Sequence, residues 1–163
     1  MEIVPAREEH LLTIQKIAFD TWPDTYGKLM SEEQFNFMMN WMYSLESLQK
    51  QLAHGQVFLL AREQNTEYGF VSYEVNYEGS SKTKIHKLYV LPSSQGKGVG
   101  KLLLTHIAEI ARSKSNTALI LNVKRDNPAV DFYQRVGFSI TDTVDIDIGH
   151  GFMMHDFVLE KSI

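Results

Sequence analysis

Three glycines alternate with other residues in a short segment, QGKGVG, that joins two apolar stretches of the chain. The stretch before it, HKLYVL, ends at Pro92, and the stretch after it, KLLL, opens a helical pattern. Glycine allows the backbone to approach a ligand closely, and the N-terminus of a helix presents unpaired amides and the positive end of the helix dipole. The segment therefore predicts a strand, an anion-binding loop and a helix in succession.

The N-terminal third of the chain has the apolar spacing of helices. Met1 to Val4 is expected to form a short edge strand, and REEHLLTIQKIAFDTW repeats apolar residues at helical intervals. Ser31 with Gln34 makes a capping box for a second helix. Ser44 is the expected cap of a third helix, which Gly55 closes.

The remaining two thirds alternate between strand and helix patterns. Three sequential antiparallel strands are expected in VFLLAR, GFVSYEVN and TKIHKLYVL, which are rich in β-branched and aromatic residues. The glycine segment is followed by a helical stripe over 99–111 and by a buried strand, ALILNVK. Asn127 is the expected cap of a helix over about 128–136 that Gly137 ends, and FSITDTV and FMMHDFVLEK supply the last two strands.

The composition restricts the classes of protein to which the chain can belong. With 163 residues, 44% of them hydrophobic, we expect a single domain over 1–163. The chain has no cysteine, which excludes a disulfide framework, a zinc-thiolate site and thiol catalysis. Its six histidines are scattered, so no metal site is expected.

Charge and hydropathy exclude further classes. A formal net charge of −4 disfavours binding to nucleic acid or to an anionic membrane, because both need a basic surface. No apolar run reaches the roughly 20 residues that span a bilayer, and MEIVPAREEH does not have the pattern of a signal peptide. We therefore expect a soluble, cytoplasmic protein.

Two common phosphate-binding loops do not fit the glycine segment. A Walker loop needs one more residue between Gly96 and the pair Gly100-Lys101, and Leu102 stands where a hydroxyl would hold magnesium. A dinucleotide loop has the pattern G-x-G-x-x-G after the first strand of a parallel unit, whereas this segment follows an expected antiparallel meander. An ATPase and a nicotinamide enzyme are both disfavoured.

Two motifs in sequence order resemble the GNAT superfamily of N-acetyltransferases. Gln95, Gly98 and Gly100 spell Q-x-x-G-x-G, and HKLYVLPSSQGKGVGKLLL is similar to the coenzyme A pyrophosphate loop of that superfamily. LNVKRDNPAVDFYQRVGF matches its N-x-x-A-x-x-F-Y-x-x-x-G-F pattern. The residues of this second match are Asn127, Ala129, Phe132, Tyr133, Gly137 and Phe138.

The resemblance implies a fold and a co-substrate. The fold class would be α/β (α+β), the GNAT fold, with a central mixed but mostly antiparallel sheet of six to seven strands flanked by helices. The co-substrate would be acetyl-coenzyme A, with its pyrophosphate on the loop and its pantetheine arm along the preceding strand. The implied cofactor-binding residues are Tyr89, Val90, Gln95, Gly96, Lys97, Gly98, Val99, Gly100, Lys101, Asn127 and Tyr133.

The resemblance also implies direct transfer of the acetyl group to an amine. A backbone amide near Val90 would stabilise the oxyanion, and Tyr133 would protonate the departing thiolate, since a phenol with a pKa of about 10 can do so. The base that deprotonates the amine stays open. Lys84 stands near the place of a catalytic glutamate found in some members, so that role cannot be carried over to this chain. His86, Glu74 and a water chain with no single base are the alternatives.

The acceptor is expected to be a small-molecule amine, with a polyamine favoured. The helical N-terminal region and the C-terminal segment look similar to bacterial spermidine/spermine N-acetyltransferases. Trp22, Asp24 and Tyr26 offer an aromatic and acidic surface to a polycation. A further run of acids consists of Asp142, Asp145, Asp147 and Asp156. Peptide N-termini, other small amines, a non-catalytic acyl-coenzyme A sensor and a homodimer remain open.

Overall fold

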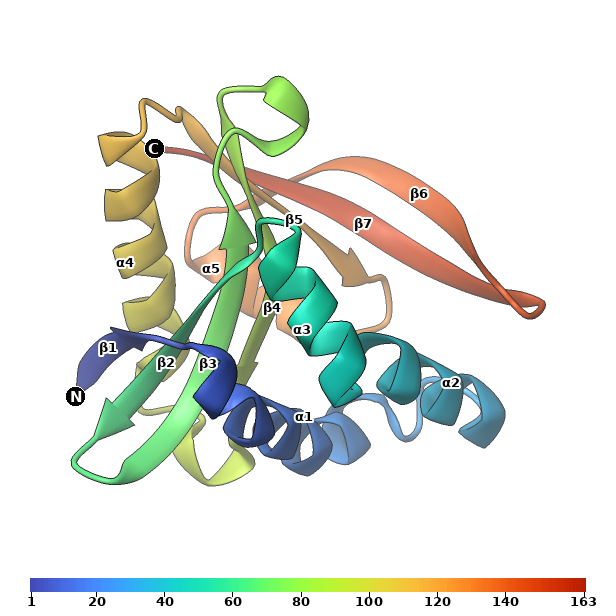
Figure 1. Cartoon of the computed structure of the whole chain (residues 1–163). Helices are drawn as coiled ribbons and strands as arrows, with labels where there is room; N and C mark the ends of the chain where they lie inside the picture. The colour runs from blue at the N-terminus through green and yellow to red at the C-terminus, as the bar shows by residue number, and fades with distance from the viewer. The chain divides into compact units, whose positions relative to one another are not determined.

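The computed structural model describes residues 1–163 as seven strands, five α-helices and three short 3₁₀ helices (Figure 1). In chain order these are β1 (Glu2–Pro5), η1 (Glu8–His10), α1 (Leu11–Tyr26), α2 (Glu32–Tyr43), α3 (Leu45–Ala53), β2 (Val57–Glu63), β3 (Thr66–Glu74), η2 (Tyr77–Gly79), β4 (Lys82–Val90), η3 (Pro92–Ser94), α4 (Val99–Ser113), β5 (Ala118–Lys124), α5 (Ala129–Arg135), β6 (Ser139–Gly149) and β7 (Phe152–Ser162). The strand order is β1-β2-β3-β4-β5-β7-β6, which confirms the predicted fold class.

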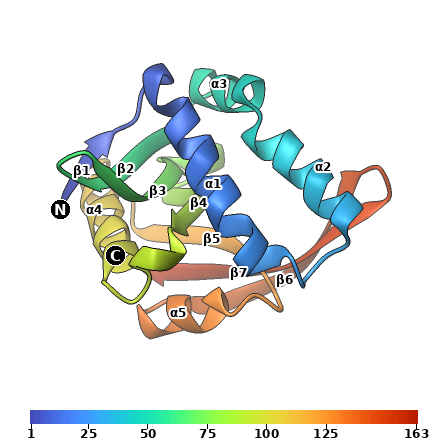
Figure 2. The same cartoon turned by 90° about the horizontal axis from the view of Figure 1, so that it is seen from below.

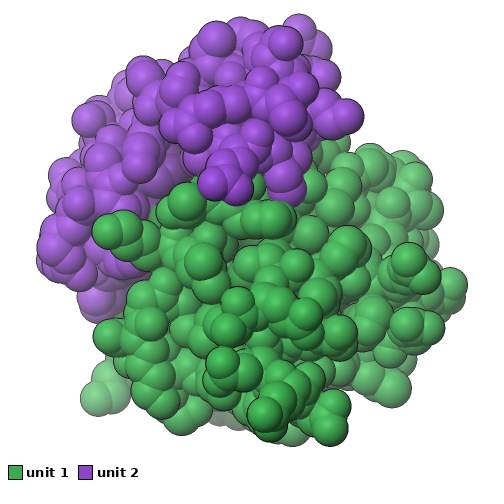
Figure 3. Space-filling view, turned by 90° about the vertical axis from the view of Figure 1, so that its left-hand side faces the viewer, with its two compact units in different colours: residues 1–74, 87–107 green, residues 75–86, 108–163 purple.

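The chain forms two compact units, which are coloured separately in Figure 3. Unit 1 comprises residues 1–74 and 87–107, and unit 2 comprises residues 75–86 and 108–163. Strand β4 and helix α4 each contribute residues to both units. The expectation of a single domain over 1–163 stays a prediction.

Unit 1 contains the N-terminal strands of the sheet. β1 and β3 each pair antiparallel with β2, and β3 is the neighbour of β4. The four residues Phe58–Ala61 of β2 are at most 4% exposed, so both faces of this strand are covered. A Cβ atom at Gly69 would lie 2.5 Å from the carbonyl oxygen of Tyr89, and the close approach of β3 to β4 therefore requires glycine.

Three helices complete the core of unit 1. Helix α1 packs against β3 and α3 (Figure 2), and it buries a stripe of residues at helical spacing. Ser31 Oγ accepts the amide of Gln34 at 3.2 Å, and Ser44 Oγ accepts that of Ser47 at 3.2 Å. The structure thus confirms the predicted caps of α2 and α3. Helix α1 continues past the predicted end at Trp22 and contains Pro23 in its last turn.

Unit 2 holds the C-terminal strands. The first half of β4 pairs parallel with β5, Lys82–Ile85 opposite Ala118–Leu121. β7 pairs antiparallel with both β5 and β6. A parallel pair needs a long crossover connection, and α4 lies between β4 and β5 in the sequence.

The local sequence predicted the bounds of α5 well and those of β6 less well. Asn127 Oδ1 accepts the amide of Ala129 at 2.9 Å, and Gly137 ends the helix with a φ of 102°. Strand β6 continues to Gly149, five residues beyond the predicted segment, because it pairs with β7 as far as Phe152. The alternation of Asp145, Ile146 and Asp147 belongs to this extension.

Candidate active site

The glycine segment forms an exposed turn that leads into α4. Gly96 and Gly98 have φ values of 76° and 79°, which only glycine adopts without strain. The amide of Leu102 donates to Gly98 O at 2.9 Å, so the preceding amides of the first turn have no partner inside the helix. Free amides and the positive end of a helix dipole are the groups that bind anions at helix N-termini, so this turn is the candidate anion-binding site.

The side chains of the turn add charge and anchor it. Lys97 and Lys101 are exposed, whereas Val99 is only 2% exposed and fastens the first turn of α4 to the core of unit 1. Gln95 Nε2 donates to Val90 O at 3.3 Å and so ties the turn to the end of β4. The loop therefore combines an anchored backbone with two exposed cations.

The end of β4 lies in an aromatic cluster. The ring of Tyr89 lies 5.7 Å from that of Phe70 and 6.2 Å from those of Tyr43 and Trp22, measured between centroids. Burial raises the pKa of Tyr89, as well as that of Tyr43, so both phenols stay protonated at neutral pH. The amide of Leu91 donates to Tyr68 O at 2.9 Å and ends the bonding of this strand to β3.

The three predicted acceptor residues on α1 differ in their environments. Trp22 is 1% exposed, with Tyr26 at 4.5 Å and Phe35 at 5.9 Å between ring centroids. Asp24 is exposed, and Tyr26 is half-buried. Trp22 therefore belongs to the core of unit 1, and Tyr43 is a member of the same cluster that the sequence did not single out.

The second motif lies in unit 2. Tyr133 is 8% exposed, and its ring packs between Phe132 at 5.3 Å and Phe138 at 5.6 Å. Asn127 is 6% exposed and caps α5 through its side-chain oxygen. The amide of Phe138 donates to Tyr133 O at 3.0 Å, which closes the helix immediately after Gly137.

The two candidate bases are both half-buried. Glu74 is the last residue of β3 and belongs to unit 1. His86 lies on β4 in unit 2, where its ring meets that of Tyr77 edge-on at 5.6 Å. These two placements do not decide between the bases that the sequence left open.

A polar face of the unit 2 sheet was not anticipated from the sequence. Lys84 Nζ donates to Asn122 Oδ1, and Asn122 Nδ2 donates to Asp156 Oδ2 at 3.5 Å. Burial lowers the pKa of Lys84 and raises that of Asp156, since both lose hydration. No residue spacing in the sequence indicates this set, because its members come from three strands.

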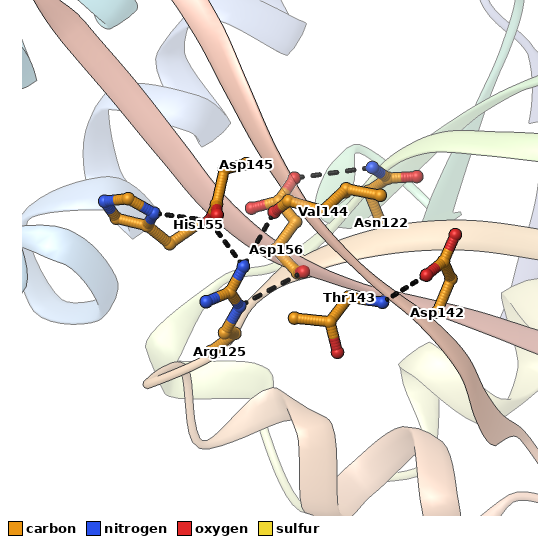
Figure 4. A network of polar contacts seen from close by, with 8 residues as sticks. All are labelled: Asn122, Arg125, Asp142, Thr143, Val144, Asp145, His155 and Asp156. Carbon is orange, nitrogen blue, oxygen red and sulfur yellow. Dashed lines mark hydrogen bonds and ion pairs between the residues drawn. The ribbon is translucent and has the colours of Figure 1, made fainter.

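The acidic run divides into exposed and buried members. Figure 4 shows the polar contacts of three of them, Asp142, Asp145 and Asp156. Asp145 is exposed and pairs with Arg125 at 2.5 Å and with His155 at 2.7 Å. Asp142 and Asp147 are also exposed, and each accepts a nearby backbone amide at 2.8 Å. Asp156 is 1% exposed. Hydrogen bonds that the Asp145 carboxylate accepts from His155 and Arg125 hold the pKa of that carboxyl below its usual value.

Comparison with known proteins places the chain in a family. A model of the acetyltransferase (GNAT) family matches residues 11–138. The chain is 29% identical over 167 residues to a spermidine N(1)-acetyltransferase of Thermoplasma acidophilum, with 99% of this chain and 96% of the relative covered. It is also 29% identical over 90 residues to an L-amino acid N-acyltransferase of Escherichia coli, which covers 53% of this chain and 52% of the relative.

Solved structures agree with this result. The PaiA N-acetyltransferase of Thermoplasma acidophilum in complex with coenzyme A has a TM-score of 0.83 at 28% identity and covers 99% of this chain and 98% of its own. A GNAT protein of Rhodopseudomonas palustris has a TM-score of 0.84 at 22% identity, with 99% and 95% covered, and shows the shared fold.

The chain belongs to the GNAT family and is an N-acetyltransferase that uses acetyl-coenzyme A. No group of three or more His, Cys, Asp or Glu side chains is arranged to hold a metal ion. None of the helices is both long enough and apolar enough to cross a membrane.

Proposed function

We propose that this enzyme acetylates a primary amino group of a polyamine. The observation that carries the proposal is the likeness over the full chain to a spermidine N(1)-acetyltransferase, together with the exposed anion-binding turn at α4. An aliphatic polyamine is a flexible polycation, and carboxylates and aromatic faces are the groups that bind it.

The pyrophosphate of acetyl-coenzyme A is assigned to the turn from Gln95 to Lys101. The two glycines with positive φ leave the main chain uncovered, since no atom lies within 4 Å of a Cβ built at Gly96 or Gly98. Lys97 and Lys101 add positive charge, and the pantetheine arm would run along Tyr89 and Val90. Asn127 would contact the arm near the thioester.

The proposed transfer is a direct attack of the amine on acetyl-coenzyme A. The neutral amine attacks the acetyl carbonyl, a main-chain amide near Val90 stabilises the negative oxygen, and the carbon–sulfur bond breaks. Tyr133 then gives its proton to the thiolate. Because the chain has no cysteine, no acyl-enzyme can form through a thiol. The transfer is therefore proposed to be direct.

Two residues, His86 and Glu74, are the candidates for accepting the proton that leaves the amine. Imidazole and carboxylate both accept protons from an ammonium ion, either directly or through one water. Substitution of each separately, followed by the pH dependence of kcat/KM, identifies which of them acts.

The acceptor side is assigned to α1. Asp24 is exposed on α1, whereas Tyr26, two residues later and therefore on a different side of the helix, is half-buried. Trp22 supports Tyr26 from the core at 4.5 Å and is assigned a positioning role. Asp24 is the carboxylate and Tyr26 the aromatic ring that this helix is proposed to offer to a polycation.

The experiment is free-thiol release from acetyl-coenzyme A with a panel of amines. Spermidine, spermine, diamines, amino acids, aminoglycosides and short peptides are compared at equal concentration. Turnover that rises with polyamines above all others supports the proposal. Preference for peptides or amino acids would move the acceptor to that class, and coenzyme A binding by calorimetry without turnover would indicate a sensor.

A further inference from the structure

The carboxylate of Asp156 is buried with few hydrogen bonds. Asp156 is 1% exposed, and its Oδ2 accepts one long bond from Asn122 at 3.5 Å. Its Oδ1 has no hydrogen-bond partner. An ionised carboxylate can accept several hydrogen bonds, and leaving one oxygen unpaired away from water is costly. Such groups in a native protein call for a functional explanation.

The nearest cations are all engaged elsewhere. Lys124 lies directly opposite Asp156 in the pairing of β5 with β7, yet its Nζ pairs with Asp126 at 2.7 Å. Arg125 donates to Asp145, to Val144 O and to the main-chain oxygen of Asp156 (Figure 4). The carboxylate is therefore attracted by positive charge but is in hydrogen-bond contact with none.

Lys84 and Asn122 fix how this carboxylate is presented. A lysine ammonium has only donors, so Lys84 takes the oxygen of the Asn122 amide. The amide nitrogen of Asn122 must then point to Asp156 Oδ2. This chain of donors satisfies one oxygen and leaves the other, Oδ1, for a ligand.

We propose that Asp156 Oδ1 binds an ammonium group of the acceptor amine. The inference rests on the proposed function and deepens it by naming a residue for the cationic substrate. An aliphatic ammonium supplies both the missing N–H donor and the missing charge partner. Lys124, the residue opposite on β5, is 18% exposed and its ammonium is held by Asp126, so it does not occupy Oδ1.

The first test is the kinetics of Asp156→Asn with spermidine as the probe. We expect KM for spermidine to rise ten- to a hundredfold, with KM for acetyl-coenzyme A and kcat changed by less than threefold. Glu160→Gln is the matched control, because Glu160 lies on the same face of β7 and also has a buried oxygen without a hydrogen-bond partner, but the Lys82 ammonium lies within salt-bridge distance of it, at 2.5 Å. Its KM for spermidine should stay within twofold of the wild type.

A second variant distinguishes an effect on the site from damage to the fold. Lys124→Met removes a nearby positive charge that repels an incoming ammonium, so KM for spermidine should fall several-fold, a change that damage to the fold would not produce. An unchanged KM in Asp156→Asn, or an unchanged or higher KM in Lys124→Met, would overturn the inference.

Calorimetry separates this inference from the proposed function. Spermidine is titrated into the coenzyme A complex of the wild type and of Asp156→Asn, without turnover. Wild-type acetylation of polyamines with equal spermidine affinity in both proteins refutes the role of Asp156 alone. Absence of polyamine acetylation refutes the proposed function, and Asp156-dependent binding of spermidine would then still support an ammonium site.

Discussion

Burial acts on acidic and basic side chains of this enzyme in opposite directions. It raises the pKa of Asp156 and lowers that of Lys84 and Lys87, in each case because the charged form loses hydration. The attraction between Lys84 and Asp156 offsets part of this loss of hydration, whereas Lys87 has no acidic partner and only Gln56 as a hydrogen-bond partner, at 3.2 Å. Desolvation therefore dominates at Lys87.

Lys87→Met should change how stability depends on pH. Burial lowers the pKa of Lys87 from 10.5 to about 8, so between these values the unfolded chain binds more protons than the folded one. Stability contributed by Lys87 thus rises with pH across this window, and below about pH 8 the penalty is at its full value of about 3 kcal/mol. Urea denaturation at pH 7.5 and 10.5 should show the wild type gaining this amount relative to the variant.

The pH dependence has a simple control. Lys114 is exposed, and Lys114→Met should run parallel to the wild type at both pH values. Parallel behaviour of Lys87→Met as well would show that the Lys87 ammonium is hydrated in the folded chain.

Tyr133→Phe should lower kcat by about 10²- to 10⁴-fold if Tyr133 protonates the thiolate. Phenylalanine keeps the packing against Phe132 and Phe138, so the dissociation constant of coenzyme A should stay within twofold. Stopped assays of thiol release and calorimetry measure the two quantities. Tyr73→Phe is the control, since it also removes a buried phenol oxygen. Equal turnover in Tyr133→Phe and the wild type would remove Tyr133 from the chemistry.

At the scale of elements, the turn before α4 is the part in which backbone conformation and binding meet. Two glycines with positive φ turn the chain, and the first turn of α4 supplies free amides. Val99 anchors this turn in unit 1 with 2% exposure. The backbone conformation of this turn therefore depends on glycine at fixed positions.

Gly98→Ala should weaken coenzyme A binding at least tenfold. Alanine at a φ of 79° is strained by about 1–2 kcal/mol, and relief of that strain moves the amides that face the phosphate. Gly79→Ala is the matched control, because Gly79 has a φ of 73° with no atom within 4 Å of a built Cβ. Calorimetry should show normal affinity for Gly79→Ala despite a similar loss of stability. Normal affinity in both variants would place the pyrophosphate elsewhere.

At the scale of the whole molecule, two elements belong to both compact units. The last residues of β4 and the first two turns of α4 lie in unit 1, and the remainder of each lies in unit 2. Because β4 and α4 belong to both units, unfolding of one unit breaks hydrogen bonds within an element that also belongs to the other.

We expect scanning calorimetry to record one transition with equal calorimetric and van't Hoff enthalpies. Saturating acetyl-coenzyme A should raise the transition temperature without splitting the peak, because the ligand binds the folded state. Two separated peaks would identify the units as independent domains and would contradict the single domain expected from the length of the chain.

Local features were predicted well because neighbouring residues decide them. Ser31, Ser44 and Asn127 cap the helices for which they were expected, and Gly137 ends α5. The end of β6 was missed because it depends on pairing with β7, which the local alternation of residues does not reveal. Trp22 illustrates the same limit, because the sequence pattern around an aromatic residue on a helix is the same whether its side chain is exposed or buried in the core.

The sequence by itself determined the α/β class, the order of the elements and the glycine turn, since backbone preferences and hydrophobic periods act over a few residues. The tertiary structure alone decided which polar groups lose water. Lys84, Asn122 and Asp156 come from β4, β5 and β7, and their coupling arises only when these strands pair. Hydration and charge interactions are properties of such assembled neighbours, so residue type and spacing do not encode them locally.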